Sequence, residues 1–318
     1  MKHIKRKKNS GLKKITPFHI INGIFLSLLI VVCVLPIVHV IALSLSNRTE
    51  AVAGNVTFFP IGFTLNAYRY VMEDKQFWTS LGVTLKRVLI GVPVNIFLVV
   101  LTAYPLSKPN QKFHGRTFFS WFFVITMLFS GGLIPSYMVL NKLKMLNSIW
   151  ALTLPGAMNI GYMILIMNFF RGVPSEIEDA AVIDGASQMQ VLFKIYLPMC
   201  LPALATIVLF ATVANWNCWM DGYMYMNTPD KYPLQTYLAT ILMQSKNNVE
   251  TLMTPDQLAR MAQISEKTIE AVGVGDVLVV EESLKYATVL VSIAPIMCVY
   301  PFLQKYYTKG IVVGSVKG

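Results

Sequence analysis

The feature that most constrains this chain is a series of six long apolar segments, each of the length that an α-helix needs to cross a bilayer, roughly 17–25 residues. They are Ile20–Leu45, Leu81–Leu106, Phe118–Leu140, Ile149–Phe170, Leu197–Ala214 and Tyr286–Leu303. Only 14% of the residues are charged, against about 25% in soluble domains. We therefore predict an all-α polytopic membrane protein with six transmembrane helices over residues 18–304.

The distribution of charge predicts the orientation of these segments. Residues 1–17 carry seven basic residues and no acid, and they precede an apolar segment, so the positive-inside rule explains them better than nucleic-acid binding. The connection after the second segment and the tail at 305–318 are also basic without acids. We expect both termini to be cytoplasmic, with residues 1–17 and 305–318 as cytoplasmic tails of a cell-membrane protein.

The region between the fifth and sixth segments is expected outside. Residues 221–282 hold nine acids and four bases, which fits an extracellular segment at 220–284. The sequence Thr254-Pro255-Asp256-Gln257 predicts the start of a helix there, and Gly273 could end it. This segment could form a cap that meets an extracellular protein or a spacer that packs on a partner subunit, and the sequence does not separate these two roles.

Between the fourth and fifth segments lies the most polar stretch of the middle of the chain, Pro174–Pro198, which then falls in the cytoplasm. Ser175 and Glu178 fit a capping box that would start a short helix, and Asp184-Gly185 would end it. A second helix ending at Pro198 is marked by apolar residues at helical spacing: Met189, Leu192, Phe193 and Tyr196. A helical hairpin with carboxylates at its head suits docking to another protein, although an ordinary capped loop fits the spacing as well.

The residues of this stretch resemble the coupling motif, the EAA loop, of bacterial ABC importer permeases. The matching positions are Asp179-Ala180-Ala181, Asp184-Gly185-Ala186, Ile195 and Leu197-Pro198. Asp179 stands where that family usually has Glu, and Glu178 precedes it, so either carboxylate could dock an ATPase. The resemblance implies that Glu178 and the residues just named couple the chain to an ATPase, and that the fold is that of a type I ABC importer permease.

Other stretches are similar to carbohydrate-uptake permeases, and together the similarities cover nearly all of the chain after residue 58. Gly62–Tyr68 and the pattern Trp216-Asn217-x-Trp219 are two of them, and Met127–Tyr137 is similar to a branch that handles complex oligosaccharides. The tail resembles that of maltose-permease-type subunits, which reaches between the ATPase subunits. This implies ATPase contacts for Gly314, Ser315, Lys317 and Gly318.

Amide and indole side chains in and near the apolar segments are candidates for a substrate path. Buried amides are costly unless they are paired or face a wet path, and sugars favour aromatic faces next to hydrogen-bonding groups. The candidates are Asn95, Asn159, Asn215, Trp216, Asn217 and Trp219. An aromatic belt at the outer interface is the alternative for the tryptophans.

The sequence lacks the signs of a catalytic subunit. It has no Gly-x-x-x-x-Gly-Lys-Ser/Thr loop for ATP, no catalytic cluster and no cysteine or histidine spacing typical of a metal site. Acidic residues are nearly missing from the apolar segments, which argues against a proton- or sodium-coupled carrier. We expect no cofactor in this chain, with ATP and Mg²⁺ bound by a partner ATPase.

The resemblance implies a permease subunit that forms half of the path for an oligosaccharide in an ATP-driven importer. Its expected partners are a second homologous permease, two cytoplasmic ATPase subunits, an extracellular solute-binding lipoprotein and the bilayer. Two alternatives remain open: a permease of this class for another solute such as a peptide, or a secondary transporter.

Overall fold

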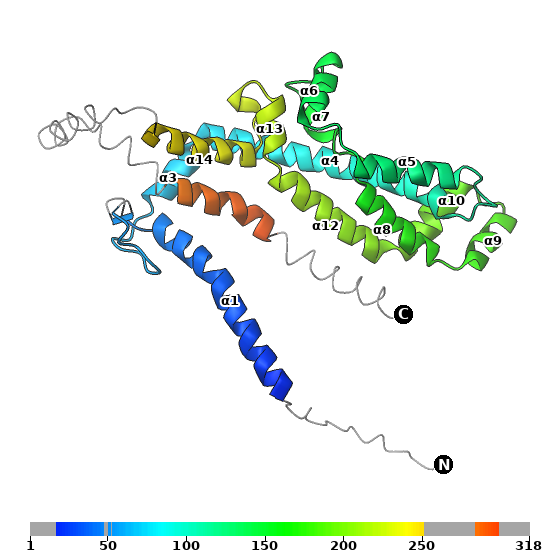
Figure 1. Ribbon diagram of the computed structural model, residues 1–318, viewed down its shortest axis with the longest axis horizontal. Coiled ribbons are helices and arrows are strands. Elements are labelled where there is room, and N and C mark those ends of the chain that lie inside the picture. The colour runs from blue at the N-terminus through cyan, green and yellow to red at the C-terminus, as the bar shows by residue number, and fades with distance from the viewer. Residues whose placement is uncertain (1–16, 48–49, 52, 251–283, 299–318) are drawn as a thin grey trace, which may run out of the picture.

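The computed structural model describes residues 17–298 except 48, 49, 52 and 251–283, and every regular element in that part of the chain is helical. Helix α4 (Lys75–Ser107) runs through the length of the bundle, and α8 (Ile160–Arg171) and α12 (Leu201–Asn217) pack along it (Figure 1). Their apolar faces form the main core, in which Val99, Ala103 and Ile166 are fully buried. The expectation of an α-helical chain is confirmed for these residues.

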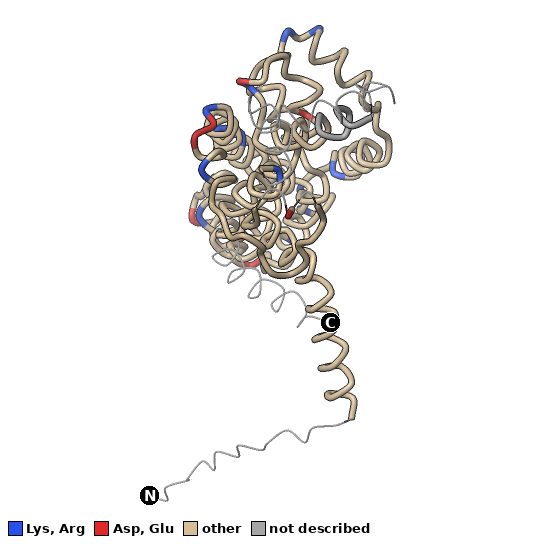
Figure 2. The backbone as a smooth tube through the Cα atoms, turned by 90° about the vertical axis from the view of Figure 1, so that its left-hand side faces the viewer, with Lys and Arg blue, Asp and Glu red and all other residues tan. Residues whose placement is uncertain are grey.

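Helix α1 (Pro17–Ser44) extends away from this bundle (Figure 1). Only its last residues, Ala42, Leu43 and Ser44, are buried, and the helix carries no charged side chain (Figure 2). An apolar helix of 28 residues is long enough to cross a bilayer. Its surface is therefore available to lipid or to another apolar helix.

By length and composition, two helices, α1 and α4, could each cross a membrane unbroken in the described part of the chain. Two bent pairs could raise this number to four. In one, α5 (Arg116–Leu128) meets α6 (Leu133–Lys142) at 113°, and in the other, helix Gln188–Met199 meets α12 at 84°. Shorter apolar helices are α8, the first part of α14 at Leu234–Met243, and Leu284–Cys298.

The expected third and fourth segments are therefore interrupted. The break between α5 and α6 falls at Gly131-Gly132, where Gly132 has a φ of 85°, a backbone conformation that suits glycine. The fourth segment is divided into α7 (Ile149–Thr153) and α8, with Pro155-Gly156 between them. The number of six membrane crossings and the cytoplasmic position of both ends stay predictions.

The end of the bundle at which α4 begins is built from several short elements. These are α3 (Asn66–Glu73), α13 (Met220–Tyr225), the 3₁₀ turn Pro229–Lys231, α14 (Leu234–Glu250) and helix Leu284–Cys298. The predicted helix from 254, the basic residues 1–16 and the tail with Gly314, Ser315, Lys317 and Gly318 lie outside the described residues. The opposite end of α4 lies near α9 and α10, where the candidate site is found (Figure 1).

Candidate functional site

The first helix of the polar stretch is α9 (Ser175–Ile183), and it ends as its sequence predicts. Gly185 has a φ of 84° and its N–H donates to the Val182 carbonyl at 3.0 Å, while the Ala186 N–H donates to the Ala181 carbonyl at 2.9 Å. These two bonds form a Schellman motif, which satisfies carbonyls at the end of a helix. The glycine therefore sets the sharp turn that follows α9.

The start of α9 corrects one expectation. The helix does begin at Ser175, directly after Pro174, but no side-chain bond caps it, so the predicted Ser175–Glu178 capping box is wrong. The Glu178 carboxylate points into the protein instead. The capping box of this region lies at Ser187 and Gln190, where it starts α10 (Gln188–Val191).

The second helix of the hairpin ends at Met199, one residue beyond the predicted end at Pro198. It continues from α10 through a π-helical turn, η1 (Leu192–Tyr196), and through α11 (Leu197–Met199) before it bends at Cys200 into α12. Pro198 has no N–H to donate and its ring crowds the carbonyl four residues earlier. A widened π turn accommodates that proline in the last turn of the helix, and the hairpin then leads through the bend at Cys200 into α12.

Glu178 is the centre of a buried polar cluster, which we call the Lys108 cluster: Lys108, Tyr104, Glu178 and Tyr196. The Lys108 ammonium and the Tyr196 hydroxyl each donate to Glu178 Oε2 at 2.7 Å. The same ammonium lies 4.1 Å from the centroid of the Tyr104 ring and 4.0 Å from that of Tyr196. A buried charge is thus matched by an opposite charge, a hydroxyl and two aromatic faces, which together offset its desolvation.

The pKa values follow from this arrangement. Burial alone would raise the pKa of Glu178, but the bonds from Lys108 and Tyr196 and the charges of Lys108 and Lys112 outweigh it, so the pKa lies below its usual value. Burial lowers the pKa of Lys108, and the attraction of Glu178 offsets only part of that effect. The Glu178 carboxylate is therefore held in its ionised form by groups of its own chain.

Asp179 differs from Glu178 in its surroundings. Its side chain is 58% exposed and accepts from Lys112 Nζ at 2.9 Å, and Lys112 also lies 3.5 Å from Glu178 Oε1. The hydrogen bond with Asp179 raises the pKa of Lys112. An exposed pair of this kind contributes little to stability, so Asp179 can exchange its partner at small cost.

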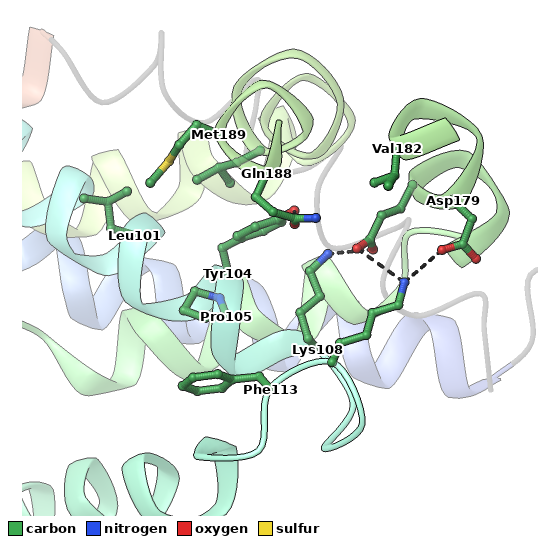
Figure 3. Close-up of a pocket in the computed structure, with 12 residues that line it drawn as sticks. Leu101, Tyr104, Pro105, Lys108, Phe113, Asp179, Val182, Gln188 and Met189 are labelled. Carbon is green, nitrogen blue, oxygen red and sulfur yellow. Dashed lines mark hydrogen bonds and ion pairs between the residues drawn. The ribbon is translucent and has the colours of Figure 1, made fainter. Parts of the chain in front are cut away.

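A cavity of about 560 Å³ is lined by residues of α9, α10 and the end of α4. Figure 3 shows Lys108 and Asp179 on its polar side, with Leu101, Pro105 and Met189 contributing apolar walls. Dashed lines in the same view trace the ion pairs between the lysines of the α4 end and the carboxylates of α9. The hairpin is therefore tied to α4 by charge on one side of an open space.

The remaining residues of the predicted coupling stretch divide into an exposed and a packed set. Ala180, Asp184, Gly185 and Pro198 are exposed. Ala181, Ala186, Ile195 and Leu197 are partly buried against the main core. One side of the hairpin is thus seated on the bundle while the other is open.

The candidates for a substrate path are not brought together in this chain. Asn95 is buried and donates to the carbonyls of Ala157 at 2.7 Å and Gly156 at 3.4 Å, which lie in the break between α7 and α8. Asn159 caps α8 by accepting from the Tyr162 N–H. Asn217 is exposed, Trp219 is partly exposed, and Trp216 is buried with an Nε1 that has no partner.

Asn215 belongs to a second charged cluster. Its Oδ1 accepts from Arg87 Nε at 3.4 Å, and the buried Arg87 also pairs with Asp221 and donates to the Cys218 carbonyl. Arg87 was not among the predicted site residues, although an arginine inside an apolar segment is itself a sign of a special role. This cluster joins α4 to the end of α12 and the start of α13.

Lys108 was also missed as a site residue. Its sequence position places it only among the basic residues of the loop that follows the second apolar segment. Its partner Glu178 lies 70 residues further along the chain, so no local spacing could have paired the two. The pair of adjacent acids, Glu178 and Asp179, was the one feature of the sequence that indicated a basic partner in this region.

Comparisons with known proteins agree with the helical fold. No family model matches the chain. The chain is 39% identical over 294 residues to the polygalacturonan/rhamnogalacturonan transport system permease protein YtcP of Bacillus subtilis (strain 168), covering 92% of this chain and 96% of that protein. It is 36% identical over 301 residues to protein LplC of the same organism, with 95% of each chain covered.

A solved structure is similar as well. It is the crystal structure of a bacterial ABC transporter involved in the import of the acidic polysaccharide alginate, and a chain of it matches with a TM-score of 0.75 at 30% identity. The match covers 91% of this chain and 96% of that one. The identity to these relatives over more than nine tenths of the chain, together with the similar structure, shows that the chain belongs to the permease subunits of carbohydrate ABC importers.

Proposed function

We propose that the chain forms half of the translocation path for an oligosaccharide in an ATP-driven importer of the cell membrane. It acts as a non-catalytic subunit beside a second permease, two cytoplasmic ATPase subunits and an extracellular solute-binding protein. The single observation that carries this proposal is the α9–Gly185–α10 hairpin, which is seated on the bundle by one face and open on the other. Membership of the permease family supports an ATPase as the partner of this hairpin.

Asp179 is the carboxylate that meets the ATPase in this proposal. Glu178 is buried and engaged by Lys108 and Tyr196, whereas Asp179 is exposed and, among the described residues, is bound by the partly exposed Lys112. A basic side chain of the ATPase could replace Lys112 with little loss. Ile183, which is 85% exposed at the tip of α9, adds apolar surface to the same contact.

The orientation follows from the role of the hairpin. ATPase subunits of such importers lie in the cytoplasm, so α9 and the α4 end that carries Lys108 are placed there. The opposite end, with α3, α13 and α14, then lies outside and faces the solute-binding protein. The apolar surface of α1, which the described part of the chain leaves uncovered, contacts lipid and the second permease.

The substrate class rests on the relatives. One relative is named for polygalacturonan and rhamnogalacturonan transport, and the similar solved structure comes from an importer of alginate. Uptake of radiolabelled fragments of these polymers should therefore be measured in cells that lack the chain and in cells to which it is restored. We expect restored uptake of at least one glycan, whereas uptake of labelled peptides alone would support a permease for another solute.

The class of transporter is tested separately by co-purification. The intact protein should bring down an ATPase subunit and a second permease from its own cells in mild detergent. A well-characterised importer purified in the same detergent serves as the control. Recovery of the chain without an ATPase, when the control retains its own, would contradict this proposal and favour a secondary transporter.

A further inference from the structure

The Lys108 cluster joins parts of the chain that must move together if α9 is to act on the bundle. Lys108 follows directly on α4, Glu178 belongs to α9, and Tyr196 ends the π turn η1 that leads toward α12. The Tyr104 hydroxyl also donates to Gln188 Oε1 of α10 at 2.8 Å. One lysine thus stands at the meeting point of the end of α4 and both helices of the hairpin.

The cluster continues into the core through aromatic contacts. The Tyr104 ring packs edge-on against Tyr196 with centroids 5.1 Å apart, and both rings contact Phe170 of α8 in the same edge-on manner. Phe170 is fully buried. A displacement of Glu178 is therefore met by packed side chains on α4, α8 and η1 rather than by solvent.

The members of the Lys108 cluster are costly to pull apart, because two of them form a buried ion pair. Removing one partner of a buried ion pair leaves the other charge uncompensated, which typically costs about 3–5 kcal/mol. The exposed pair of Asp179 and Lys112 has no such penalty, because water can replace either partner. The two adjacent carboxylates of α9 thus differ in kind: one is fixed to the bundle and one is exchangeable.

We propose that Lys108 is the positioning residue that transmits movement of α9 to α4, by holding Glu178 and the rings of Tyr104 and Tyr196 as one rigid joint. This rests on the proposed function, since it takes α9 to be the part that the ATPase moves. Glu178 then has no role in ATPase binding, which belongs to Asp179 and the exposed face of α9. Loss of Lys108 should leave the ATPase bound but should disconnect its movement from α4.

Hydrogen exchange in the reconstituted importer tests this joint without knowledge of the solute. The complete complex is compared with and without a non-hydrolysable ATP analogue and Mg²⁺, and exchange is followed in peptides covering 175–183 and 99–107. In the wild type we expect the nucleotide to change exchange in both peptides. In Lys108→Met we expect the change in 175–183 to persist and the change in 99–107 to fall at least about tenfold, the factor that corresponds to about 1.4 kcal/mol.

Three further variants separate transmission from folding. Lys75→Met removes an exposed lysine at the opposite end of the same helix and should behave as the wild type. Lys108→Arg keeps a cation that can stack on both rings and bind the carboxylate, so it should restore most of the response in 99–107. Glu178→Gln keeps the shape but not the charge, so it should show the same loss as Lys108→Met.

The outcomes distinguish the two proposals. If the nucleotide changes nothing in 175–183 of the wild type, the proposed function fails. If 175–183 responds in all variants and 99–107 still responds in Lys108→Met, only the joint is overturned. If Lys108→Met and Glu178→Gln fail to assemble while Lys75→Met assembles, the cluster serves folding alone, and the transmission role is rejected.

Discussion

Gly185 carries the sharpest prediction at the scale of a single residue. Its φ of 84° is costly for an L-residue, yet a Cβ placed there would meet no atom within 4 Å. Gly185→Ala should therefore lose about 1–2 kcal/mol through backbone strain alone, whereas Gly185→Asn should lose less, because Asn tolerates this conformation. Thermal unfolding of the purified protein would show the order, and equal midpoints for Ala and Asn would contradict it.

A matched control is Gly82→Ala. Gly82 lies within α4, has no positive φ and leaves open space for a Cβ. Alanine is favoured over glycine in a helix by about 0.5–1 kcal/mol, so this variant should be neutral or slightly more stable. The contrast isolates the backbone conformation of Gly185 from a general effect of adding a methyl group.

The ionisation of Glu178 makes the stability of the Lys108 cluster depend on pH. Because its pKa is depressed in the folded state, its stabilisation is present above the ordinary carboxyl pKa and is lost as the pH falls through the depressed value. The groups that face it are Lys108, Lys112 and Tyr196. The difference in thermal midpoint between the wild type and Glu178→Gln should therefore be constant near neutral pH and shrink only in acid; a difference that shrinks already near neutral pH would contradict this account.

Sequence patterns predicted the local parts of the site but not the contacts between distant parts. The turn at Gly185 depends on residues within one helical turn, and it was found where expected. The supposed capping box failed because Glu178 finds a better partner in Lys108, which only the tertiary fold brings near. The partners of Asn95, Gly156 and Ala157, likewise lie far along the chain and could not be predicted from local spacing, and a place for Asn95 on a substrate path stays a prediction.

At the scale of elements, the broken segments are the departure from a simple six-helix picture. Gly131-Gly132 and Pro155-Gly156 lie at two of the breaks, but what satisfies the freed backbone could not be read from the sequence. Between α7 and α8 it is the Asn95 amide, donating to two carbonyls. Irregular backbone inside a bilayer requires such internal partners.

Asn95→Leu tests this support of the α7–α8 break. It should remove the donor from the Ala157 carbonyl and cost about 1–3 kcal/mol for a buried acceptor left without a partner. Asn141→Leu, at an exposed position on α6, should change the thermal midpoint little. A wild-type midpoint for Asn95→Leu would mean that the break needs no donor from α4.

At the scale of the whole molecule, the chain is organised around α4. One end of this helix is joined to the α9–α10 hairpin by the Lys108 cluster, and a site nearer the other end is joined to α12 and α13 through Arg87, Asn215 and Asp221. Each connection contains a buried cation: Lys108, which directly follows α4, and Arg87, which lies within α4. A helix fixed in this way at two points can carry a movement of the hairpin along the length of the bundle.

The central claim is that the α9–Gly185–α10 hairpin faces the cytoplasm and meets the ATPase, and labelling at Ile183 tests it most directly. Ile183→Cys, in a background without Cys33, Cys200, Cys218 and Cys298, is treated with a membrane-impermeant maleimide in inside-out and right-side-out vesicles. We predict labelling only in inside-out vesicles, and protection when the ATPase subunits are bound. Labelling in right-side-out vesicles would contradict the account.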